Sequence, residues 1–351
     1  MMKLIYILAF LFTISTSVKG QHQLIWSDEF EGETLNTDYW NYDIGNGSSG
    51  WGNNELEYYT SRPENIKVEN GKLIITARYE SYSGFNYTSA RINTKHKKYF
   101  GYGRIEMSAK LPKGRGTWPA FWMLPEYVVY GTKYWPDNGE IDIMEYVGYL
   151  PSVVHGSIHT NKNYAGNSVT NKITYYGVED DFHTYAVEWT YDTIRYYVDN
   201  YMYGSYKRSG RDWQYWPFDQ NFFILLNFAV GGNWGGAQGV DNTIFPQTFE
   251  IDYVRVYDLG YNVGVSENSL NNFNTKLFPN PTSDYIDIQL NDNTSGAFQV
   301  SVYDIQGRQV IPTTNYQNSS GTVNLSKLNA GIYFLKVLNA NKTGTFKIVK
   351  I

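Results

Sequence analysis

Short runs in which apolar and polar residues alternate recur along most of the chain. They lie at residues 65–68, 72–77, 103–110, 185–189, 194–198, 222–230 and 249–257. A period of two is the period of a β-strand, whose successive side chains point to opposite faces. Turn-forming pairs such as Asn70-Gly71 and Asp199-Asn200 separate the runs, and helical periodicity is nearly absent. Many short strands at this spacing predict an all-β sandwich or barrel.

The same pattern divides the chain into parts. Residues 22–259 carry all 10 Trp and all 5 His. Residues 260–275 are rich in Asn, Ser and Gly with isolated apolar residues, which is typical of a linker. Residues 276–351 form a second, smaller β-rich stretch without Trp, His or Cys, and nothing in it has a catalytic pattern. We therefore expect one large domain and one small domain.

The first twenty residues have the pattern of an export signal. Lys3 gives a positive start, an apolar stretch runs from Leu4 to Ile14, and small residues surround a cleavage point near Gly20. A membrane anchor is the alternative, but the apolar run is shorter than the roughly 20 residues that span a bilayer. We expect residues 1–20 to be a signal peptide.

Composition narrows the classes of partner. Charged residues make up 18% of the chain and the net charge is -5, which argues against nucleic acid as a partner. Aromatic residues reach 17%, with 33 Tyr and 10 Trp, and their flat faces suit sugar rings as well as the packing of sheets. The absence of Cys excludes thiol catalysis, and it leaves the core or a bound metal ion to stabilise an exported protein.

Three acids follow one another closely at Glu140, Asp142 and Glu145. In a strand, Glu140 and Asp142 share one face, whereas strict alternation would bury Glu145. Burying an unpaired carboxylate costs several kcal/mol. A β-bulge at Ile143-Met144 adds one residue and returns Glu145 to the acidic face. We therefore predict three carboxyl groups along one face of a bulged strand.

Such a set suits glycoside hydrolysis, in which one carboxylate attacks the sugar and a second, protonated carboxyl assists departure of the leaving oxygen. A retaining reaction needs the two carboxyls about 5–5.5 Å apart and an inverting reaction about 6.5–9.5 Å. Trp-rich stretches at residues 118–125 and 227–236 flank the acids in the sequence. A strand with solvated acids, or a set of calcium ligands, is the alternative interpretation.

At these residues the chain resembles glycoside hydrolase family 16, in particular its bacterial laminarinase branch. The family's E-x-D-x-x-E pattern falls on Glu140, Asp142 and Glu145. Further matches are W-P-A-F-W-M-L-P at 118–125, W-S-D-E-F at 26–30, W-G-N-N-E at 51–55, H-T-Y at 183–185 and D-Y-V-R-V-Y at 252–257. The resemblance covers residues 22–259.

The resemblance implies a β-jelly-roll sandwich with an open cleft. It implies Glu140 as nucleophile, Glu145 as general acid/base and Asp142 as the assisting carboxylate. The residues that it implies for sugar binding are Asn54, Arg91, Trp118, Trp135, His159 and Trp234. It also implies a structural calcium ion held by Glu29, the backbone carbonyl of Gly71 and Asp252, with no cofactor in catalysis.

The substrate that this resemblance implies is a β-1,3-glucan of the laminarin type, cut internally. Nothing in the sequence indicates more than a monomer. This chain has one more residue between Asp142 and Glu145 than some other branches of the family have. The extra residue favours the laminarinase, agarase and carrageenan-cleaving branches. Mixed-linkage glucan, agarose and porphyran stay open as substrates, and so does a jelly roll that binds glucan without cutting it.

Residues 276–351 resemble the sorting domain of the type IX secretion system. The matching motifs are F-P-N-P-T-S at 278–283, V-Y-D-I-Q-G-R at 302–308, L-N-A-G-I-Y at 328–333 and the basic end K-I-V-K at 347–350. The resemblance implies the secretion machinery as a partner and a secreted or cell-surface location. A plain binding module is the alternative.

Overall fold

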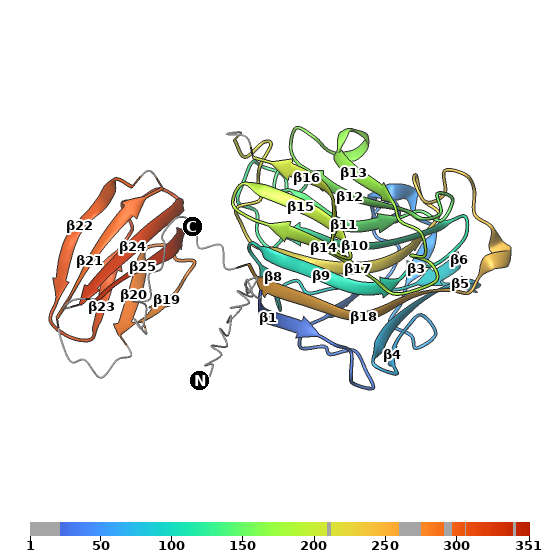
Figure 1. Cartoon of the computed structure of the whole chain (residues 1–351), viewed down its shortest axis with the longest axis horizontal. Helices are drawn as coiled ribbons and strands as arrows, with labels where there is room; N and C mark the ends of the chain where they lie inside the picture. The colour runs from blue at the N-terminus through green and yellow to red at the C-terminus, as the bar shows by residue number, and fades with distance from the viewer. Residues whose placement is uncertain (1–21, 209–211, 260–274, 291–296, 306, 340–341) are drawn as a thin grey trace, which may run out of the picture. The chain divides into compact units, whose positions relative to one another are not determined.

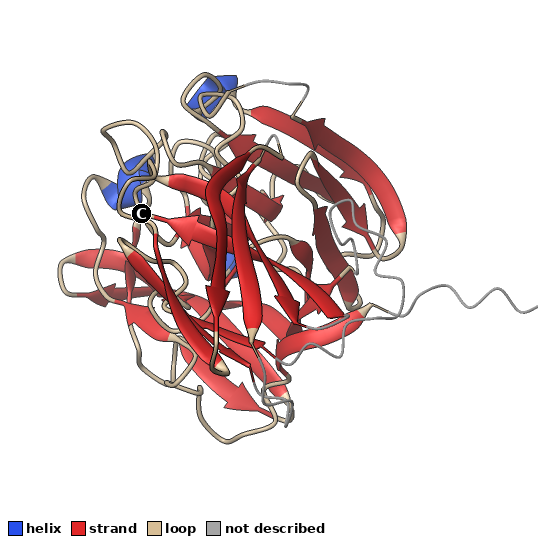
Figure 2. Ribbon diagram, turned by 90° about the vertical axis from the view of Figure 1, so that its left-hand side faces the viewer, coloured by secondary structure: helices blue, strands red, loops and turns tan. Residues whose placement is uncertain are grey.

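The computed structural model describes residues 22–208, 212–259, 275–290, 297–305, 307–339 and 342–351. The predicted signal peptide and nearly all of the predicted linker lie outside these residues. The chain forms two compact units, Met1–Tyr261 and Asn262–Ile351. Regular structure in both is almost entirely β-strand (Figure 2). No helix among the described residues combines the length and apolar character needed to cross a membrane.

Strands and a few helical turns form the regular structure, and most strands of both units are labelled in Figure 1. In the first unit they are β1 Gln23–Asp28, β2 Asn41–Asp43, η1 Gly50–Asn54, β3 Glu57–Tyr59, β4 Ile66–Glu69, β5 Lys72–Tyr82, β6 Phe85–Ser89, β7 Arg91–Asn93, β8 Tyr99–Phe100, β9 Gly103–Lys110, β10 Thr117–Pro125, β11 Glu140–Tyr146, β12 Val153–His159, η2 Ala165–Asn167, β13 Val169–Thr174, β14 His183–Trp189, β15 Thr193–Val198, β16 Tyr201–Lys207, β17 Phe222–Val230, η3 Asn242–Ile244 and β18 Gln247–Asp258. In the second they are β19 Thr275–Phe278, β20 Tyr285–Leu290, β21 Phe298–Asp304, β22 Gln309–Tyr316, β23 Ser320–Asn324, β24 Gly331–Asn339 and β25 Lys342–Lys350.

Two large sheets make up the first unit. One has the order β16-β15-β14-β9-β18-β5-β6-β3, with β1 beside β18 and β4 beside β5. The other has the order β13-β12-β11-β10-β17-β7-β2, with β8 beside β17. Buried apolar side chains of both sheets form one core, to which β9 gives Ile105 and Met107 and β17 gives Ile224 and Leu226. This is the predicted all-β sandwich.

Each alternating run of the first unit lies within a strand, apart from Asn65 directly before β4, which confirms the prediction from the period of two. The turn at Asn70-Gly71 joins β4 to β5, and both residues have positive φ, 54° and 70°. A two-residue hairpin of type I′ requires this conformation, which Asn and Gly adopt at little cost. The local residues therefore set the register of this hairpin.

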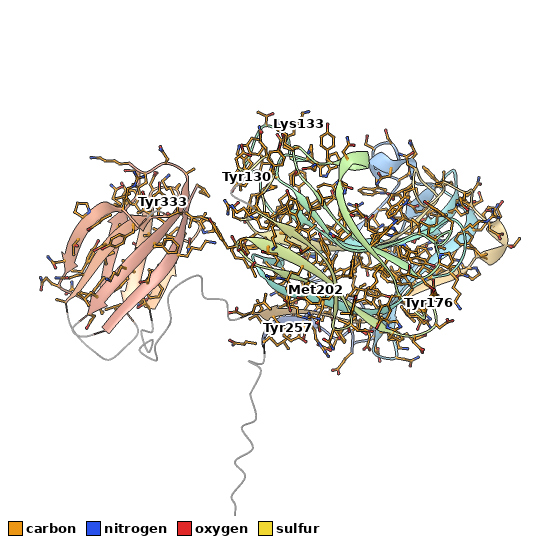
Figure 3. The ribbon with its side chains drawn as sticks, turned by 45° about the horizontal axis from the view of Figure 1, so that its top comes forward. Tyr130, Lys133, Tyr176, Met202, Tyr257 and Tyr333 are labelled. Atoms are coloured by element: carbon orange, nitrogen blue, oxygen red, sulfur yellow. The ribbon has the colours of Figure 1, made fainter. Side chains whose placement is uncertain are left out.

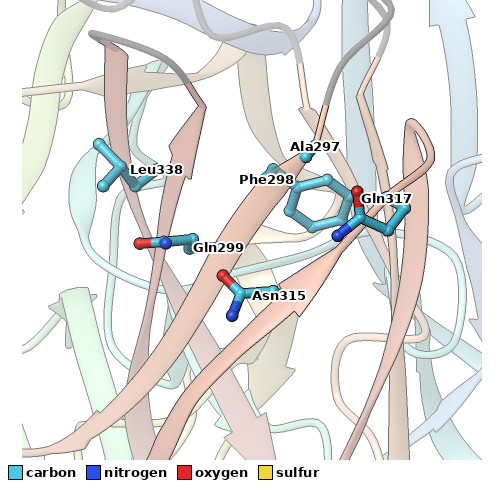
Figure 4. A pocket seen from close by; sticks show the side chains of 6 residues that line it. All are labelled: Ala297, Phe298, Gln299, Asn315, Gln317 and Leu338. Carbon is cyan, nitrogen blue, oxygen red and sulfur yellow. The ribbon is translucent and has the colours of Figure 1, made fainter.

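The second unit is a small sandwich of its own. Its sheets have the orders β19-β20-β23 and β22-β21-β24-β25. Both contribute to a separate core, with Ile286 and Ile288 from β20 and Val300 and Val302 from β21. One hollow of about 270 Å³ is lined by Ala297, Phe298, Gln299, Asn315, Gln317 and Leu338 (Figure 4). No residue that lines this hollow belongs to the predicted catalytic set.

Candidate active site

A β-bulge in β11 places the three acids on one face. Asp142 and Glu145 lie opposite Ser157 and His155, so three steps along β11 match two steps along β12. The register with β10 shifts at the same place. Ile143 and Met144 are both fully buried in the core, which accommodates the extra residue. The bulge predicted at Ile143-Met144 is confirmed.

Residues paired between neighbouring strands form two rows of side chains that run across the sheet from β13 to β2 and include Asp142 and Glu145. The row through Glu145 consists of Lys172, His155, Glu145, Ala120, Asn227, Arg91 and Asp43. The row through Asp142 consists of Thr170, Ser157, Asp142, Trp122, Leu225, Asn93 and Asn41. Directly paired residues present their side chains on the same face. We call the face that carries these two rows the acid face; the opposite face contributes the core.

An indole N–H contacts each of the two glutamates. Trp135 Nε1 donates to Glu140 Oε2 at 2.6 Å, and Trp118 Nε1 donates to Glu145 Oε1 at 3.2 Å. Trp135 is 37% exposed, whereas Trp118 is 8% exposed and packs edge-on against Trp234, with 5.6 Å between ring centroids. Trp135 is therefore the open aromatic surface beside the acids, and Trp118 is a buried support for Glu145.

Asp142 lies between the glutamates and is 2% exposed. His159 Nε2 is 3.2 Å from Asp142 Oδ2, within ion-pair distance, although the direction does not make a regular hydrogen bond. Burial raises the pKa of Asp142 well above its usual value, and the charges of Glu140 and Glu145 add to this effect. Burial and the two neighbouring acids therefore both favour the protonated form of Asp142.

His159 contributes to the same group of charges. Burial lowers the pKa of His159, but the neighbouring Glu140, Asp142 and Glu145 outweigh burial and raise the pKa to about 10. The backbone N of Ala165 lies 3.1 Å from Nδ1. The three acids favour the protonated imidazole, and its positive charge in turn lowers the pKa of Glu145.

Glu145 has the electrostatics of a general acid. Burial raises the pKa of Glu145 to about 7, with His159 and Trp118 opposing the increase and Glu140 and Glu55 adding to it. Its neighbour His155 packs edge-on against Trp234, with 4.9 Å between centroids, and burial lowers the pKa of His155 to about 4. A neutral His155 therefore places no cation beside Glu145 at neutral pH.

The loop before β11 is held by two side chains that fix Trp135. Asn138 Oδ1 accepts from the backbone N–H groups of Val129 and Tyr130, both at 2.7 Å. Asp137 Oδ2 accepts from Thr132 and Lys133, both at 3.0 Å. In this loop Lys133 is exposed and Tyr130 is half-buried (both labelled in Figure 3). These bonds order the segment that brings the indole of Trp135 to Glu140.

Arg91 lies on the acid face four strands away from β12. Its Nε donates to Asp43 Oδ2 at 2.9 Å, and its guanidinium lies 4.2 Å from the ring centroid of Trp51 and 5.0 Å from that of Trp122. Contact with two indoles fixes the plane of the guanidinium. Arg91 is thus a rigid polar group in the same row as Glu145.

Asn54 and Trp234 come from two segments that contact each other. Asn54 Nδ2 donates to Asn233 Oδ1 at 2.9 Å, and Asn233 N donates to Asn53 O at 2.7 Å. Asn54 is exposed and Trp234 is half-buried. The structure therefore associates all six predicted sugar-binding residues with the acid face or with the loops next to it.

Several residues of this face were not predicted from the sequence. They are Asp43, Trp51, Trp122, His155 and Asn227. The position of Trp122 on this face could have been predicted from the sequence, because Trp122 follows Trp118 by four residues in one strand and therefore points to the same side. Asp43 and Asn227 are joined to the site by strand pairing between distant segments, for which the sequence carries no local signal.

One of the predicted calcium ligands, Glu29, is engaged by another side chain. Both carboxylate oxygens of Glu29 accept from Arg255, at 2.9 and 2.7 Å, and this bond lowers the pKa of Glu29. The side chain of Glu29 is thus engaged by a guanidinium. Among the described residues, the side chains that cluster closely enough for a cation are Glu140, Asp142 and His159, whose nitrogen is not a ligand that calcium prefers.

Comparison with known proteins agrees with this geometry. Residues 53–255 match the model for glycosyl hydrolases family 16. The chain belongs to this family. Residues 276–351 match the secretion system C-terminal sorting domain, so the exported location and the second resemblance are confirmed.

Individual relatives in this family resemble the chain closely. A β-glucanase from Rhodothermus marinus is 51% identical over 251 residues, which cover 69% of this chain and 87% of that protein. The laminarinase crystal structure from the same organism has a TM-score of 0.66 at 50% identity and covers 68% of this chain and 98% of that chain. A laminarinase from Flavobacterium sp. UMI-01 has a TM-score of 0.63 at 45% identity, covering 67% and 100%. The chain is accordingly a glycoside hydrolase.

Proposed function

We propose that this family 16 hydrolase cuts internal β-1,3-glucosidic bonds of laminarin-type glucans by a retaining, double-displacement reaction. The observation that carries the proposal is the bulged strand β11. It places Glu140 and Glu145 on the acid face with a buried carboxyl between them, and each glutamate has its own indole donor. The similarity to laminarinases supports the choice of glucan.

The first step requires a proton donor and a nucleophile on the same face. Glu145, with a pKa raised to about 7, donates its proton to the glycosidic oxygen as the bond to the anomeric carbon breaks. The Glu140 carboxylate attacks that carbon and forms a covalent glycosyl-enzyme. Trp135 Nε1–H holds Glu140 Oε2, which leaves the other oxygen of the carboxylate for the attack.

The second step reverses the roles. Glu145, now ionised, takes a proton from water, and the water oxygen replaces Glu140 at the anomeric carbon. A protonated Asp142 beside Glu140 limits the repulsion between neighbouring carboxylates as charge returns to the nucleophile. The chain's own carboxyls thus supply the nucleophile and both proton transfers, and the proposal assigns no cofactor to catalysis.

Internal cleavage follows from the position of the acids within their sheet. Strands β12 and β13 lie on one side of β11, and β10, β17, β7 and β2 lie on the other. Neighbouring strands are about 4.8 Å apart, so polar and aromatic side chains extend well beyond a single sugar in both directions. A polymer crossing the strands can bind on both sides of the reacting bond, as an endo-acting enzyme requires. Since every residue of the rows comes from one chain, we also propose that the enzyme acts as a monomer.

A polysaccharide panel tests this function. Purified enzyme is incubated with laminarin, mixed-linkage β-glucan, agarose and porphyran, and reducing ends and oligosaccharide products are measured, with E140S as the inactive control. We expect fastest release from laminarin, with internal oligosaccharides as early products. Preference for a galactan would overturn the proposed substrate, and turnover by E140S would remove Glu140 from its role.

A further inference from the structure

A pair of buried acids lies outside the catalytic set. Glu57 is 0% exposed and Glu55 is 7% exposed, although within the described part of the chain the hydrogen bonds to both come from neutral groups. Ionised carboxylates in such a place are costly unless they are paired or protonated. The pair therefore needs a physical explanation.

All but one of the carboxyl oxygens of Glu55 and Glu57 accept a hydrogen bond. Glu55 accepts from Asn53 Nδ2 and from the Tyr59 hydroxyl, both at 3.1 Å. Glu57 Oε2 accepts from the backbone N–H of Val230 at 2.6 Å, while its buried Oε1 has no donor among the described residues. Protonation of Glu57 explains the missing donor, and the side chain of Glu55, which interacts with Glu57 through a hydrogen bond, can accept that proton. Burial and then the nearby charge of Glu55 raise the pKa of Glu57 well above its usual value, which agrees with this assignment.

The pair joins two segments that carry sugar-binding residues. The Leu56 N–H donates to Val230 O at 2.9 Å, and Glu55 forms a β-bridge with Gly231. Gly232 follows directly, and a Cβ there would approach Glu55 Cγ to 3.4 Å, so little space separates the segments. One segment carries Asn54 and the other carries Trp234. The carboxyl groups of Glu55 and Glu57 thus lie where the two segments meet, and this contact sets the distance between Asn54 and Trp234.

We propose that Glu55 and Glu57 are positioning residues, whose carboxyl groups share one proton and so fasten residues 53–57 to residues 230–234. The proposal rests on the proposed function, because the two glutamates are proposed to hold Asn54 and Trp234 in position to bind the sugar. When the second carboxyl ionises, two negative charges face each other in a buried site and the fastening weakens. Sugar affinity should then fall at alkaline pH, independently of the chemical step.

Other titratable groups face the pair and bear on its ionisation. The Tyr59 hydroxyl contacts Glu55, and burial raises the pKa of Tyr59 well above its usual value, so it stays neutral. Arg91 acts on Tyr59 from β7 and gives a positive charge on that side. On β11, Glu145 is affected by Glu55, whose charge contributes to the raised pKa of Glu145. Replacing Glu55 would therefore also change the acid/base, and Glu57 is the cleaner position for a test.

The test compares E57Q with E57A in the full chain. The amide introduced by E57Q keeps an oxygen for the Val230 N–H and offers an N–H₂ donor to Glu55, as the protonated carboxyl does, whereas the methyl group left by E57A offers neither. E69Q, at an exposed residue paired with Lys67 on β4, is the control. Measurements are KM and kcat on the polysaccharide that the wild type cuts, and amide hydrogen exchange of residues 230–236, both at mildly acidic and at alkaline pH.

We expect E57A to raise KM about tenfold with little change in kcat and to speed amide exchange in residues 230–236. E57Q should match the wild type at acidic pH and keep its KM at alkaline pH, where the wild-type KM rises. Equal KM values for E57A and E57Q, or exchange that none of the changes affects, would overturn the proposal. If E57A does not fold, the alkaline comparison of E57Q with the wild type decides. Because hydrogen exchange needs no substrate, failure of the pair can be distinguished from failure of the proposed function.

Discussion

The indole N–H of Trp118 donates a hydrogen bond to Glu145, with 3.2 Å between Nε1 and Oε1. An indole nitrogen can only donate, so this bond stabilises the ionised carboxylate. Burial acts in the opposite direction and is the larger effect, and the pKa of Glu145 is raised to about 7. The balance keeps Glu145 able both to give and to take a proton near neutral pH, as a retaining reaction demands.

This balance predicts the alkaline side of the pH profile. Since Glu145 must be protonated to act as an acid, kcat/KM should fall as the pH rises through about 7. The W118F substitution removes a donor that lowers the pKa of Glu145, so the alkaline limb should move to higher pH. Initial rates on laminarin across the pH range measure both effects. A limb that moves to lower pH in W118F would contradict the assignment of the acid.

Replacing the acid itself should depend on the leaving group. E145Q should reduce kcat on laminarin by about 10²–10⁴-fold, because the departing sugar oxygen then receives no proton. An aryl β-glucoside with a good leaving group needs little protonation and should lose less in the first step. Azide should restore turnover of that substrate by attacking the glycosyl-enzyme. Equal losses on both substrates would show that Glu145 acts in some other way.

Trp135 combines two roles that substitution can separate. W135F keeps a flat ring but loses the N–H that holds Glu140 Oε2, so kcat should fall several-fold while KM changes little. W135A removes the ring as well, and KM should rise by about tenfold or more, because stacking on a sugar is lost. Steady-state kinetics on laminarin give both constants. If W135F changed KM alone, the contact with Glu140 would have no part in catalysis.

The buried residues of the bulge should contribute to the stability of the first unit. Met144 is fully buried, and M144A should destabilise the first unit by about 2–5 kcal/mol through the cavity it creates. M202A is a matched control, since Met202 is 50% exposed at the surface (Figure 3) and its loss should cost less than about 0.5 kcal/mol. All ten Trp lie in residues 22–259, so Trp fluorescence during urea unfolding reports this unit. Equal effects of the two substitutions would contradict the packing of the bulge.

Much of this arrangement could be predicted from the sequence because it follows from local rules. Alternation indicated the strands, and the cost of burying Glu145 indicated the bulge before Glu145. The pairing of distant segments carries no such signal. Asp43 reaches Arg91 because β2 pairs with β7, and Glu57 reaches Val230 across 173 positions of sequence. The predicted use of Glu29 for calcium rested on resemblance alone, and its carboxylate is bound to Arg255.

The central claim is that Glu140 forms a covalent bond with the sugar, and trapping tests it most directly. The enzyme is treated with a 2-deoxy-2-fluoro β-glucan oligosaccharide that carries an activated leaving group, digested with protease and examined by tandem mass spectrometry. The account predicts one added glycosyl group per chain, attached to Glu140, and no label in E140S. A label on Glu145 or Asp142, or steady turnover with no covalent species, would contradict it.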